Sequence, residues 1–237
     1  MSRNVAIVIP AKDEEASIKA VIDDIRAHYA AAEIIVIDDC SSDSTFALLK
    51  SLNLTAIRHL ENRGAWQATQ TGMLYAYEKG YKYVLTMDAD GQHSAAESKV
   101  LLETIERDSD IDMVVGSCVQ RGTGAKKLAW RLFRAIGGIA IEDVTSGFRV
   151  YNRAALAVLT SEQAALLEYQ DVGVLLLLKS AGLKYIEIPV TINARMAGHS
   201  RLFHSWFKIG FYMISTLLLS LSKSAPENRA KLFRRLK

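Results

Sequence analysis

The sequence is poor in the residues that define several protein classes. Two cysteines, Cys40 and Cys118, occur in 237 residues. They are too few for a disulfide framework, so a reducing compartment is expected. Three prolines leave no proline-rich linker, and no internal repeat is visible. The formal net charge of +3 is too small to argue for a nucleic-acid partner.

Two common phosphate-binding signatures are also absent. No Gly-x-Gly-x-x-Gly follows the first apolar run, which counts against a dinucleotide-dependent dehydrogenase, and no Gly-Lys-Ser/Thr loop occurs. A strand-like run begins directly after Met1–Asn4, so no signal peptide is expected there. Half of the residues are apolar and 23% are charged, an ordinary globular composition with room for one large α/β domain or two small ones.

Strand and helix patterns alternate through the first half of the chain. Continuous apolar runs are typical of buried parallel strands, and each is followed by an amphipathic helical pattern. We expect the acidic residues at 13–15 to lie in the first turn of the first helix. Four such units predict right-handed crossovers and a doubly wound, mainly parallel α/β sheet. The predicted strands are 5–9, 34–37, 54–58 and 83–87, and the helices follow at about 13–25, 45–52, 65–79 and 95–107.

The second half continues the alternation less regularly. A basic helix after residue 124 has a positive face that is either solvated or close to a phosphate or a membrane. The segment 143–151 is expected to be a loop that becomes a strand. The remaining predicted elements are a strand at 112–117, a helix at 171–181 and a strand at 184–190.

Carboxylates follow three of the predicted strands, and the clearest pair is Asp88 and Asp90. In doubly wound sheets, ligands bind at the carboxyl ends of the strands. Two carboxylates one residue apart repel each other unless a cation lies between them. Mg²⁺ or Mn²⁺ carrying phosphate oxygens would suit that place, and Gly91 allows a turn there. The plain alternative is an acidic turn after a strand.

The end of the chain is basic and apolar. Arg195 and Arg201 suit diphosphate oxygens, although two solvent-facing arginines are the plainer interpretation. The apolar run 209–222 would make about 21 Å of helix, shorter than the ~30 Å hydrocarbon core of a bilayer. With its aromatic residues and the basic tail, it predicts a helix in an anionic membrane face. A single tilted span or burial in a homo-oligomer stays open.

Three motifs resemble those of the family 2 glycosyltransferases, inverting enzymes of the GT-A fold that use a nucleotide-activated sugar. They are Val8–Glu15, Ile37–Thr45 and Met87–His93. The Asp-Ala-Asp-Gly-Gln-His form, the Thr-Ser-Gly-Phe-Arg stretch and the late Arg-x-x-Gly-x-Ser-Arg are closest to the polyprenyl-phosphate (dolichyl-phosphate) mannosyl- and glucosyltransferase branch. The resemblance covers residues 4 to about 202. It implies a catalytic domain at 1–201, and the apolar run with its basic tail predicts a membrane-associating helix at 202–237.

The resemblance also implies residue roles. Asp90 and Gln92, with Asp88, would hold Mg²⁺ or Mn²⁺, and Asp88 and Ala89 would also touch the nucleotide. Arg195 and Arg201 would bind the diphosphate or an acceptor phosphate. The base and ribose pocket would be lined by Pro10, Lys12, Glu14, Ile37 and Asp39.

The chain departs from the family pattern at four positions. Asp13 stands where asparagine is usual. Lys12 stands where the branch often has tyrosine, so no aromatic ring is available there to stack on the base, and the identity of the nucleotide base stays open. Cys40 replaces a glycine. Cys118 stands where the branch has an arginine, and Arg121 is a candidate replacement. Larger members have two or four membrane spans, whereas this chain has at most one.

The implied chemistry places Asp90, Asp143 and Arg149 in the catalytic set. A divalent ion and arginines stabilise the charge that develops on the departing nucleoside diphosphate. A lipid phosphate is already an anion and needs no base. A hydroxyl acceptor would need one, for which Asp143 is the candidate, unless its carboxylate caps its own turn. Arg149 is expected to position that loop.

Three functions therefore stay open. The first is sugar transfer from GDP-mannose or a UDP-sugar to a polyprenyl phosphate at the cytoplasmic face of a membrane, reached through 202–237. The second is transfer to a hydroxyl of a polysaccharide or a lipid-linked glycan. The third is a non-catalytic nucleotide-sugar-binding membrane scaffold. None of the three involves nucleic acid.

Overall fold

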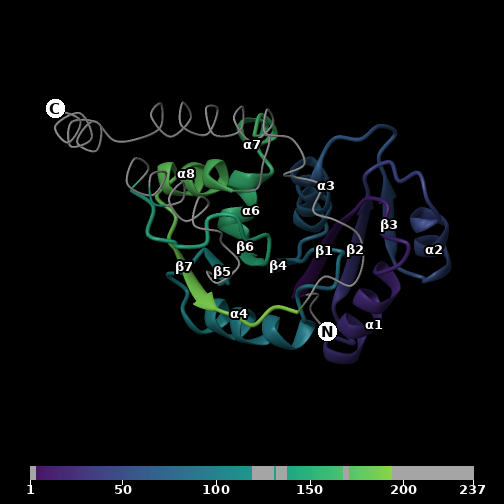
Figure 1. The fold of residues 1–237 in the computed structure, drawn as a ribbon. Helices are drawn as coiled ribbons and strands as arrows, with labels where there is room; N and C mark the ends of the chain where they lie inside the picture. Colours follow the sequence, from purple (N-terminus) through teal and green to yellow (C-terminus); the bar gives the residue numbers. More distant parts are fainter. Residues whose placement is uncertain (1–3, 119–130, 132–137, 168–170, 194–237) are drawn as a thin grey trace.

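The structure is a computed structural model that describes residues 4–118, 131, 138–167 and 171–193. Within these residues the strands and helices alternate as far as α4, and three helices and three strands follow (Figure 1). The elements are β1 (Val5–Ala11), α1 (Ile18–His28), β2 (Glu33–Asp38), α2 (Thr45–Ser51), β3 (Thr55–Arg58), α3 (Ala65–Glu78), β4 (Tyr83–Thr86), α4 (Ala95–Arg107), β5 (Met113–Ser117), β6 (Arg149–Asn152), α6 (Arg153–Leu159), α7 (Glu162–Ala165), α8 (Val172–Ser180) and β7 (Tyr185–Pro189).

The described strands form one seven-stranded sheet in the order β3-β2-β1-β4-β6-β5-β7. The pairs β1–β2, β1–β4, β2–β3 and β5–β7 are parallel, which confirms the predicted mainly parallel α/β sheet. Strand β6 runs antiparallel to both β4 and β5, and Arg149 lies opposite Thr86 at the end of β4. Because β6 starts at the carboxyl edge of the sheet, the loop that precedes it also lies at that edge.

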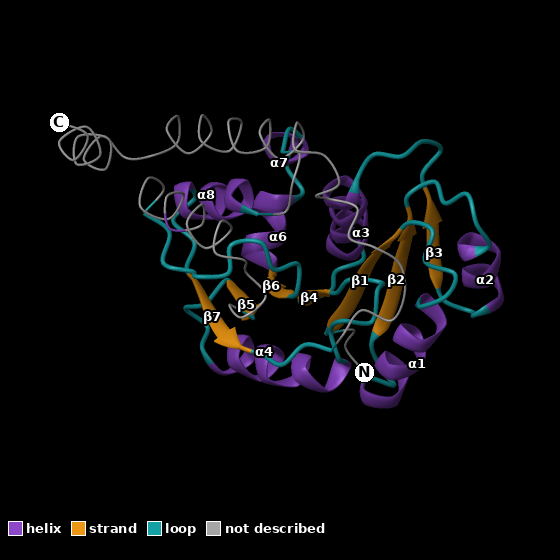
Figure 2. Ribbon diagram, in the orientation of Figure 1, coloured by secondary structure: helices purple, strands orange, loops and turns teal. Residues whose placement is uncertain are grey.

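Two apolar cores cover the two faces of the sheet. Helices α3, α6, α7 and α8 lie on one side, and α1 and α4 lie on the other (Figure 2). Neighbouring residues of a strand enter different cores: Val8 packs with the α3 side and Ile7 with the α1 side. This explains the continuous apolar runs, since a strand covered on both faces has no polar side.

Helix α3 is seated closely on the sheet. A Cβ atom at Gly72 would lie 2.4 Å from Cγ1 of Val8, so the helix approaches β1 at a distance that only glycine allows. Its polar side chains attach it to the following helices, because the Trp66 indole N–H donates to the Ala164 carbonyl at 2.9 Å and the Gln70 amide donates to the Leu159 carbonyl at 2.9 Å. The amino end of α3 is thereby held in one place.

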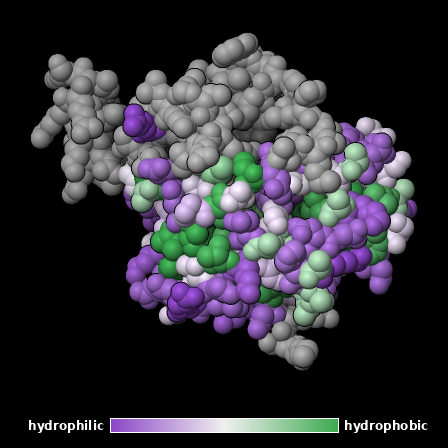
Figure 3. Space-filling model, turned by 60° about the horizontal axis from the view of Figure 1, so that its bottom comes forward, coloured by the Kyte–Doolittle hydropathy of each residue, from purple (hydrophilic) through white to green (hydrophobic). Residues whose placement is uncertain are grey.

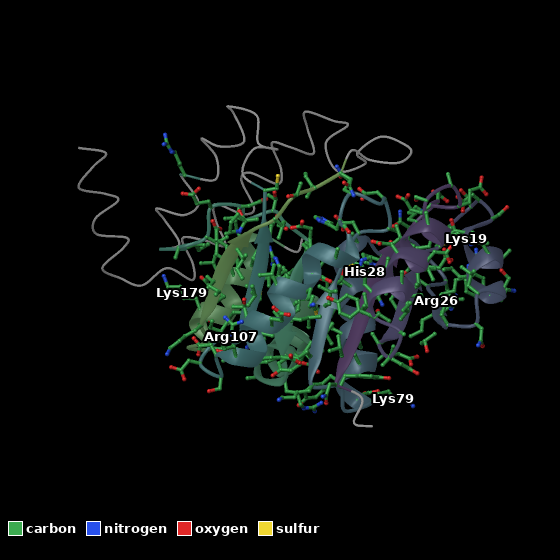
Figure 4. The ribbon with its side chains drawn as sticks, turned by 90° about the horizontal axis from the view of Figure 1, so that it is seen from below. Lys19, Arg26, His28, Lys79, Arg107 and Lys179 are labelled. Carbon is green, nitrogen blue, oxygen red and sulfur yellow. The ribbon has the colours of Figure 1, made fainter. Side chains whose placement is uncertain are left out.

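The outer surface of the α1–α4 side is polar. Figure 3 shows one face on which hydrophilic residues predominate and hydrophobic residues gather in separate patches. Of the basic side chains labelled in Figure 4, Lys19 pairs with Asp23 on the same helix and His28 lies 3.3 Å from Asp24. Arg26 donates to the carbonyl of Leu52. These side chains of α1 therefore make local contacts.

One sequence-based prediction is wrong. The acidic residues at 13–15 do not lie in the first turn of a helix, since α1 begins at Ile18 with Ser17 as its N-cap. The Glu14 carboxylate accepts a hydrogen bond from the Ser17 hydroxyl at 2.8 Å, and Asp13 has a left-handed φ of 49°. The acidic segment is a turn before the helix, where its backbone meets the loop after β2.

Several predictions concern residues that the structure does not describe. They are the basic helix after residue 124, the candidate Arg121, the arginines Arg195 and Arg201, and the helix and tail at 202–237. In the parts of the chain that are described, no helix has both the length and the apolar character needed to cross a membrane.

Candidate functional site

Four loops meet at the carboxyl edge of the sheet, and they carry most of the predicted site residues that the structure describes. Three of these loops follow β1, β2 and β4, and the fourth precedes β6. The topology therefore brings together the segments 12–14, 38–42, 88–92 and 143–148.

The loops after β1 and β2 are tied together by polar contacts. The Lys12 ammonium donates to the carbonyl of Cys40 at 2.9 Å, and the Glu14 amide donates to the Thr45 hydroxyl at 2.8 Å. Under these loops, Pro10 of β1 lies opposite Ile37 of β2, whose side chain is fully buried. The residues predicted to line the base and ribose pocket are thus neighbours, and the Lys12 side chain is directed toward the loop after β2.

Asp39 organises the loop that leads into α3. Asp39 is 3% exposed. Its carboxylate accepts hydrogen bonds from the backbone N–H groups of Arg63 and Gly64, both at 2.8 Å. His59 Nδ1 lies 2.8 Å from the same carboxylate, and its Nε2 lies 3.0 Å from the Thr71 hydroxyl. Sequence reasoning missed His59, and only the Asn62–Gly64 turn signal pointed to this loop.

The loop after β4 contains a hydrogen bond from its own backbone to Asp90. Asp90 is buried, and its Oδ1 accepts a hydrogen bond from the backbone N–H of Gln92 at 2.9 Å. Gly91 has a left-handed φ of 76°, which confirms the expected turn. The neighbouring Ala89 is also buried, whereas the Asp88 side chain is 42% exposed. Asp88 is thus the carboxylate of this loop that reaches solvent.

The loop before β6 packs directly against Asp88. The Thr86 hydroxyl donates to the carbonyl of Gly147 at 2.6 Å, and a Cβ atom at Gly147 would lie 3.2 Å from Oδ1 of Asp88. On the other side, His93 Nε2 lies 3.5 Å from Oδ2 of Asp88. Sequence reasoning singled out neither Gly147 nor His93 as a neighbour of Asp88, because nothing in the spacing of the motifs pairs them.

Asp143 and Arg149 stabilise the same loop from within. The Asp143 carboxylate accepts from the backbone N–H of Cys118 at 3.1 Å and from the Thr145 hydroxyl at 3.2 Å. The fully buried Arg149 guanidinium donates to the carbonyl of Val144 at 3.0 Å. Asp143 therefore caps its own turn and also anchors the end of β5.

Glu187 of β7 supports this loop from the sheet edge. Its carboxylate accepts hydrogen bonds from the backbone N–H groups of Glu142 and Asp143. Burial raises the pKa of Glu187 above its ordinary value, an effect that these two N–H groups oppose and that the Glu142 and Asp143 charges reinforce. The carboxylates of Glu142, Asp143 and Glu187 therefore lie close together beside β7.

The last described segment returns to the loop after β4. The backbone N–H of Asn193 donates to the backbone carbonyl of Gln92 at 2.8 Å, and the backbone N–H of Val190 donates to the backbone carbonyl of Ser117 at 3.0 Å. The chain thus passes the Asp88–Gln92 loop two residues before Arg195. Arg195 and Arg201 themselves lie outside the described residues.

The predicted metal ligands are two carboxylates and one amide. In the described residues, no group of three or more His, Cys, Asp or Glu side chains is arranged to hold a metal ion. The set Asp88, Asp90 and Gln92 contains only two such residues, so that finding does not test it. Its all-oxygen chemistry fits Mg²⁺ or Mn²⁺, and the lack of a side chain at Gly147 leaves room beside Asp88.

Comparison with known proteins decides the family. A family model described as glycosyl transferase family 2 matches residues 6–159, a stretch that contains every loop described above except the segment near Asn193. The chain belongs to glycosyltransferase family 2.

Two relatives of this family 2 glycosyltransferase have names that refer to dolichyl or polyprenyl phosphate compounds. It is 32% identical over 213 residues to the UDP-N-acetylglucosamine–dolichyl-phosphate N-acetylglucosaminyltransferase of Methanococcus voltae, a match that covers 78% of this chain and 83% of the relative. It is 26% identical over 215 residues to the polyprenol monophosphomannose synthase of Mycolicibacterium smegmatis, covering 83% and 80%.

The fold also matches solved structures. The glucosyl-3-phosphoglycerate synthase of Mycobacterium tuberculosis, in complex with Mn²⁺, UDP and phosphoglyceric acid, superposes with a TM-score of 0.70. The match covers 93% of this chain and 78% of the other, at 20% sequence identity. At that identity the similarity shows that this glycosyltransferase shares the fold.

Proposed function

We propose that this family 2 glycosyltransferase moves a sugar, with inversion, from a nucleoside-diphosphate sugar to a polyprenyl phosphate at a membrane surface. One observation carries the proposal: the Asp88–Gln92 loop lies against the loop of Asp143–Phe148 at the carboxyl edge of the sheet. A donor diphosphate and an acceptor can therefore be held side by side. The name of one relative contains dolichyl phosphate, and the name of the other gives polyprenol monophosphomannose as its product.

The donor site is assigned to the loops after β1, β2 and β4. Lys12, Glu14 and Asp39 line the nucleoside side, over Pro10 and Ile37, and Ala89 lies beside Asp88. Asp88, Asp90 and Gln92 would hold Mg²⁺ or Mn²⁺ on the diphosphate. Such an ion stabilises the negative charge that develops on the departing nucleoside diphosphate.

The state of Asp143 favours a phosphate acceptor over a hydroxyl. Its buried carboxylate already accepts hydrogen bonds from Cys118 and Thr145, so it is occupied in holding its turn. A general base must reach the proton that it removes. An acceptor phosphate needs no such base because it is already an anion.

Two arginines complete the assignment. We assign Arg195 and Arg201 to the donor diphosphate or the acceptor phosphate, because Asn193 is hydrogen-bonded to Gln92 just before them. Guanidinium groups bind phosphate oxygens in a bidentate manner. The helix and basic tail at 202–237 would hold the chain at the cytoplasmic face of an anionic membrane.

The donor is assigned to the UDP-sugar class, with GDP-mannose as the competitor. UDP-N-acetylglucosamine is named in the Methanococcus voltae relative, whereas the Mycolicibacterium relative is named for mannose. Lys12 is directed toward the carbonyl of Cys40, so it offers no stacking surface for a base.

The test is a transfer assay with the full chain. UDP-N-acetylglucosamine, UDP-glucose and GDP-mannose are each offered with vesicles containing a short polyprenyl phosphate, the matching polyprenol, or a soluble glycan, in Mn²⁺ or in a chelator. We expect metal-dependent transfer from one donor to the polyprenyl phosphate alone, with inverted anomeric configuration by NMR. Transfer to the glycan or the polyprenol would contradict the proposed acceptor.

Matched variants separate chemistry from folding. Asp90→Ala is expected to lose at least a hundredfold in turnover, because the charge on the leaving group is no longer stabilised. Asp23→Ala removes an exposed carboxylate that pairs with Lys19 on α1 and with no other described residue, and this variant should act as the wild type does. Nucleotide binding without transfer to any acceptor would point to the scaffold function instead.

A further inference from the structure

His93 is a buried imidazole that the assignment above does not use. Its side chain is 1% exposed, and its ring stacks on the ring of Phe148 with centroids 4.6 Å apart and planes 11° apart. His93 lies just after the Asp88–Gln92 loop, and Phe148 lies in the loop before β6. The stack therefore joins the two loops on which the proposed function depends.

Phe148 is held rigidly. A Cβ atom at Gly116 would lie 2.5 Å from Cδ1 of Phe148, so the ring is pressed against β5. The Gly116 amide donates to the Phe148 carbonyl at 2.8 Å, and the Ser146 hydroxyl donates to the Gly116 carbonyl at 2.6 Å. The ring under His93 is thus fixed by the sheet itself.

The other feature of His93 is its direction toward Asp88. Nε2 lies 3.5 Å from Oδ2 of Asp88, while Oδ1 of the same carboxylate faces Gly147. Among the described residues, neither ring nitrogen of His93 has a hydrogen-bond partner. Burying an imidazole without hydrogen bonds is unfavourable, and an apolar ring of similar size would stack on Phe148 without that penalty.

We propose that His93 is a positioning residue for Asp88, rigid on Phe148, whose Nε2–H hydrogen-bonds the Asp88 carboxylate when a nucleoside diphosphate and a divalent cation enter the site. The neutral imidazole suffices, because one ring nitrogen carries a proton. Partners that orient a ligand side chain typically change metal affinity 10–100-fold when removed. The inference rests on the proposed function, since it assigns a ligand to the Asp88 loop.

The test compares two variants of the full chain. His93→Phe keeps an aromatic ring on Phe148 but has no nitrogen, and His93→Gln keeps an N–H donor at about the reach of Nε2. Mn²⁺ is titrated into each protein at saturating UDP or GDP, whichever the wild type binds, by thermal shift and by the loss of the free Mn²⁺ EPR signal. Neither readout requires turnover, and unfolding by urea checks stability.

We expect His93→Phe to fold at least as stably as the wild type and to weaken Mn²⁺ binding about tenfold. His93→Gln should regain most of that loss. In an Asp88→Asn background, His93→Phe should have no further effect, because the histidine acts through that carboxylate. Unchanged Mn²⁺ affinity in His93→Phe, or a loss that persists fully in the Asp88→Asn background, would overturn the inference.

The two proposals fail in different ways. A wild type that binds Mn²⁺ with a nucleotide, beside a His93→Phe variant that binds them equally well, removes only the role of His93. A wild type that binds neither Mn²⁺ nor any nucleotide removes the proposed function, and the role of His93 with it.

Discussion

Arg149 is a buried cation with no matching charge among the residues that the structure describes. Only one of its nitrogens has a hydrogen-bond partner, the carbonyl of Val144, and Nε and Nη1 have none among the described residues. A buried charge without compensation lowers the stability of the folded state. The hydrogen bond that Arg149 does make, to the Val144 carbonyl, holds the turn that carries Asp143. We therefore infer that Arg149 serves the geometry of the site rather than the stability of the fold.

Replacing Arg149 should therefore separate stability from turnover. We expect the free energy of unfolding of Arg149→Met to be within about 1 kcal/mol of the wild type or higher, because a buried charge with no partner in the described parts of the chain leaves together with one hydrogen bond. Turnover should fall at least tenfold as the Val144 turn loosens. Urea unfolding and the transfer assay measure the two effects, with Arg153→Met, at an arginine that donates to the carbonyls of Tyr77 and Tyr81, as the control.

Cys40 occupies a backbone conformation that favours glycine. Its φ is 59°, in the left-handed region, at the position where the family pattern has glycine. We expect Cys40→Gly to raise the free energy of unfolding by about 0.5–1 kcal/mol, since the strain of a side chain at positive φ exceeds the extra chain entropy of glycine. Urea unfolding measures it.

A matched control for this change is available at Asn53, which has a φ of 48°. Asparagine tolerates the left-handed region better than cysteine does, so Asn53→Gly should give a smaller gain. An equal or larger gain at Asn53 would show that strain at Cys40 is not the cause.

At the scale of elements, the strand–helix units could be predicted because their signals are local. The apolar runs and helical faces that predicted β1 to α4 are contained within about a dozen residues each. The direction of β6 could not be predicted in the same way, because it depends on pairing with β4 and β5, which lie far away in the sequence. The prediction that Asp13–Glu15 open a helix was wrong because their contacts with the β2–α2 loop are also non-local.

The same distinction holds for the site. The grouping of carboxylates at the strand ends followed from parallel topology alone. The stack of His93 on Phe148 and the hydrogen bonds from Arg63 and Gly64 to Asp39 join different units of the chain. No spacing within one segment indicates them.

Strand β7 gives the fold a pH-dependent contact through Glu187. Burial raises the pKa of Glu187 above its ordinary value of 4.5. The folded state thus binds this proton more tightly than the unfolded state does. Its contribution to stability is fully present below the unfolded pKa and is lost as the pH rises through the folded pKa.

Glu187→Gln should remove that part of the pH dependence. The amide keeps an oxygen that can accept from the Glu142 and Asp143 N–H groups, but it does not titrate. We expect the variant to gain stability relative to the wild type as the pH rises from about 4 to about 7, measured by urea unfolding across that range. A stability difference that does not change with pH would contradict this.

For the whole molecule, the question is how the glycosyltransferase domain would meet the proposed lipid acceptor. The described chain ends at Asn193, hydrogen-bonded to Gln92, and the residues assigned to the membrane follow. Lys231, Arg234, Arg235 and Lys237 would each contribute about 1 kcal/mol at an anionic surface.

Deletion of residues 203–237 should therefore abolish sedimentation with anionic vesicles and leave nucleotide binding intact, because all the residues of the proposed donor site precede residue 203. Vesicle sedimentation and a thermal-shift titration with the nucleotide measure the two properties. Neutralising the four basic tail residues is the companion variant, and its sedimentation should weaken and become less sensitive to salt. Full sedimentation of the deleted chain would contradict the assignment.

The place of β6 in the sheet has a consequence for a chain that is still being synthesised. Strands β1 to β4 can assemble first, but β4 then remains an open edge, with backbone groups that invite foreign strands. Strand β5 cannot cover it, because β6 must come between them. When β6 arrives, it closes that edge and in the same step delivers Gly147 and Phe148 to the Asp88 loop. A nascent chain is therefore most exposed to aggregation while it is still inactive. Pairing of β6 with β4 both removes the open strand edge and completes the surroundings of Asp88.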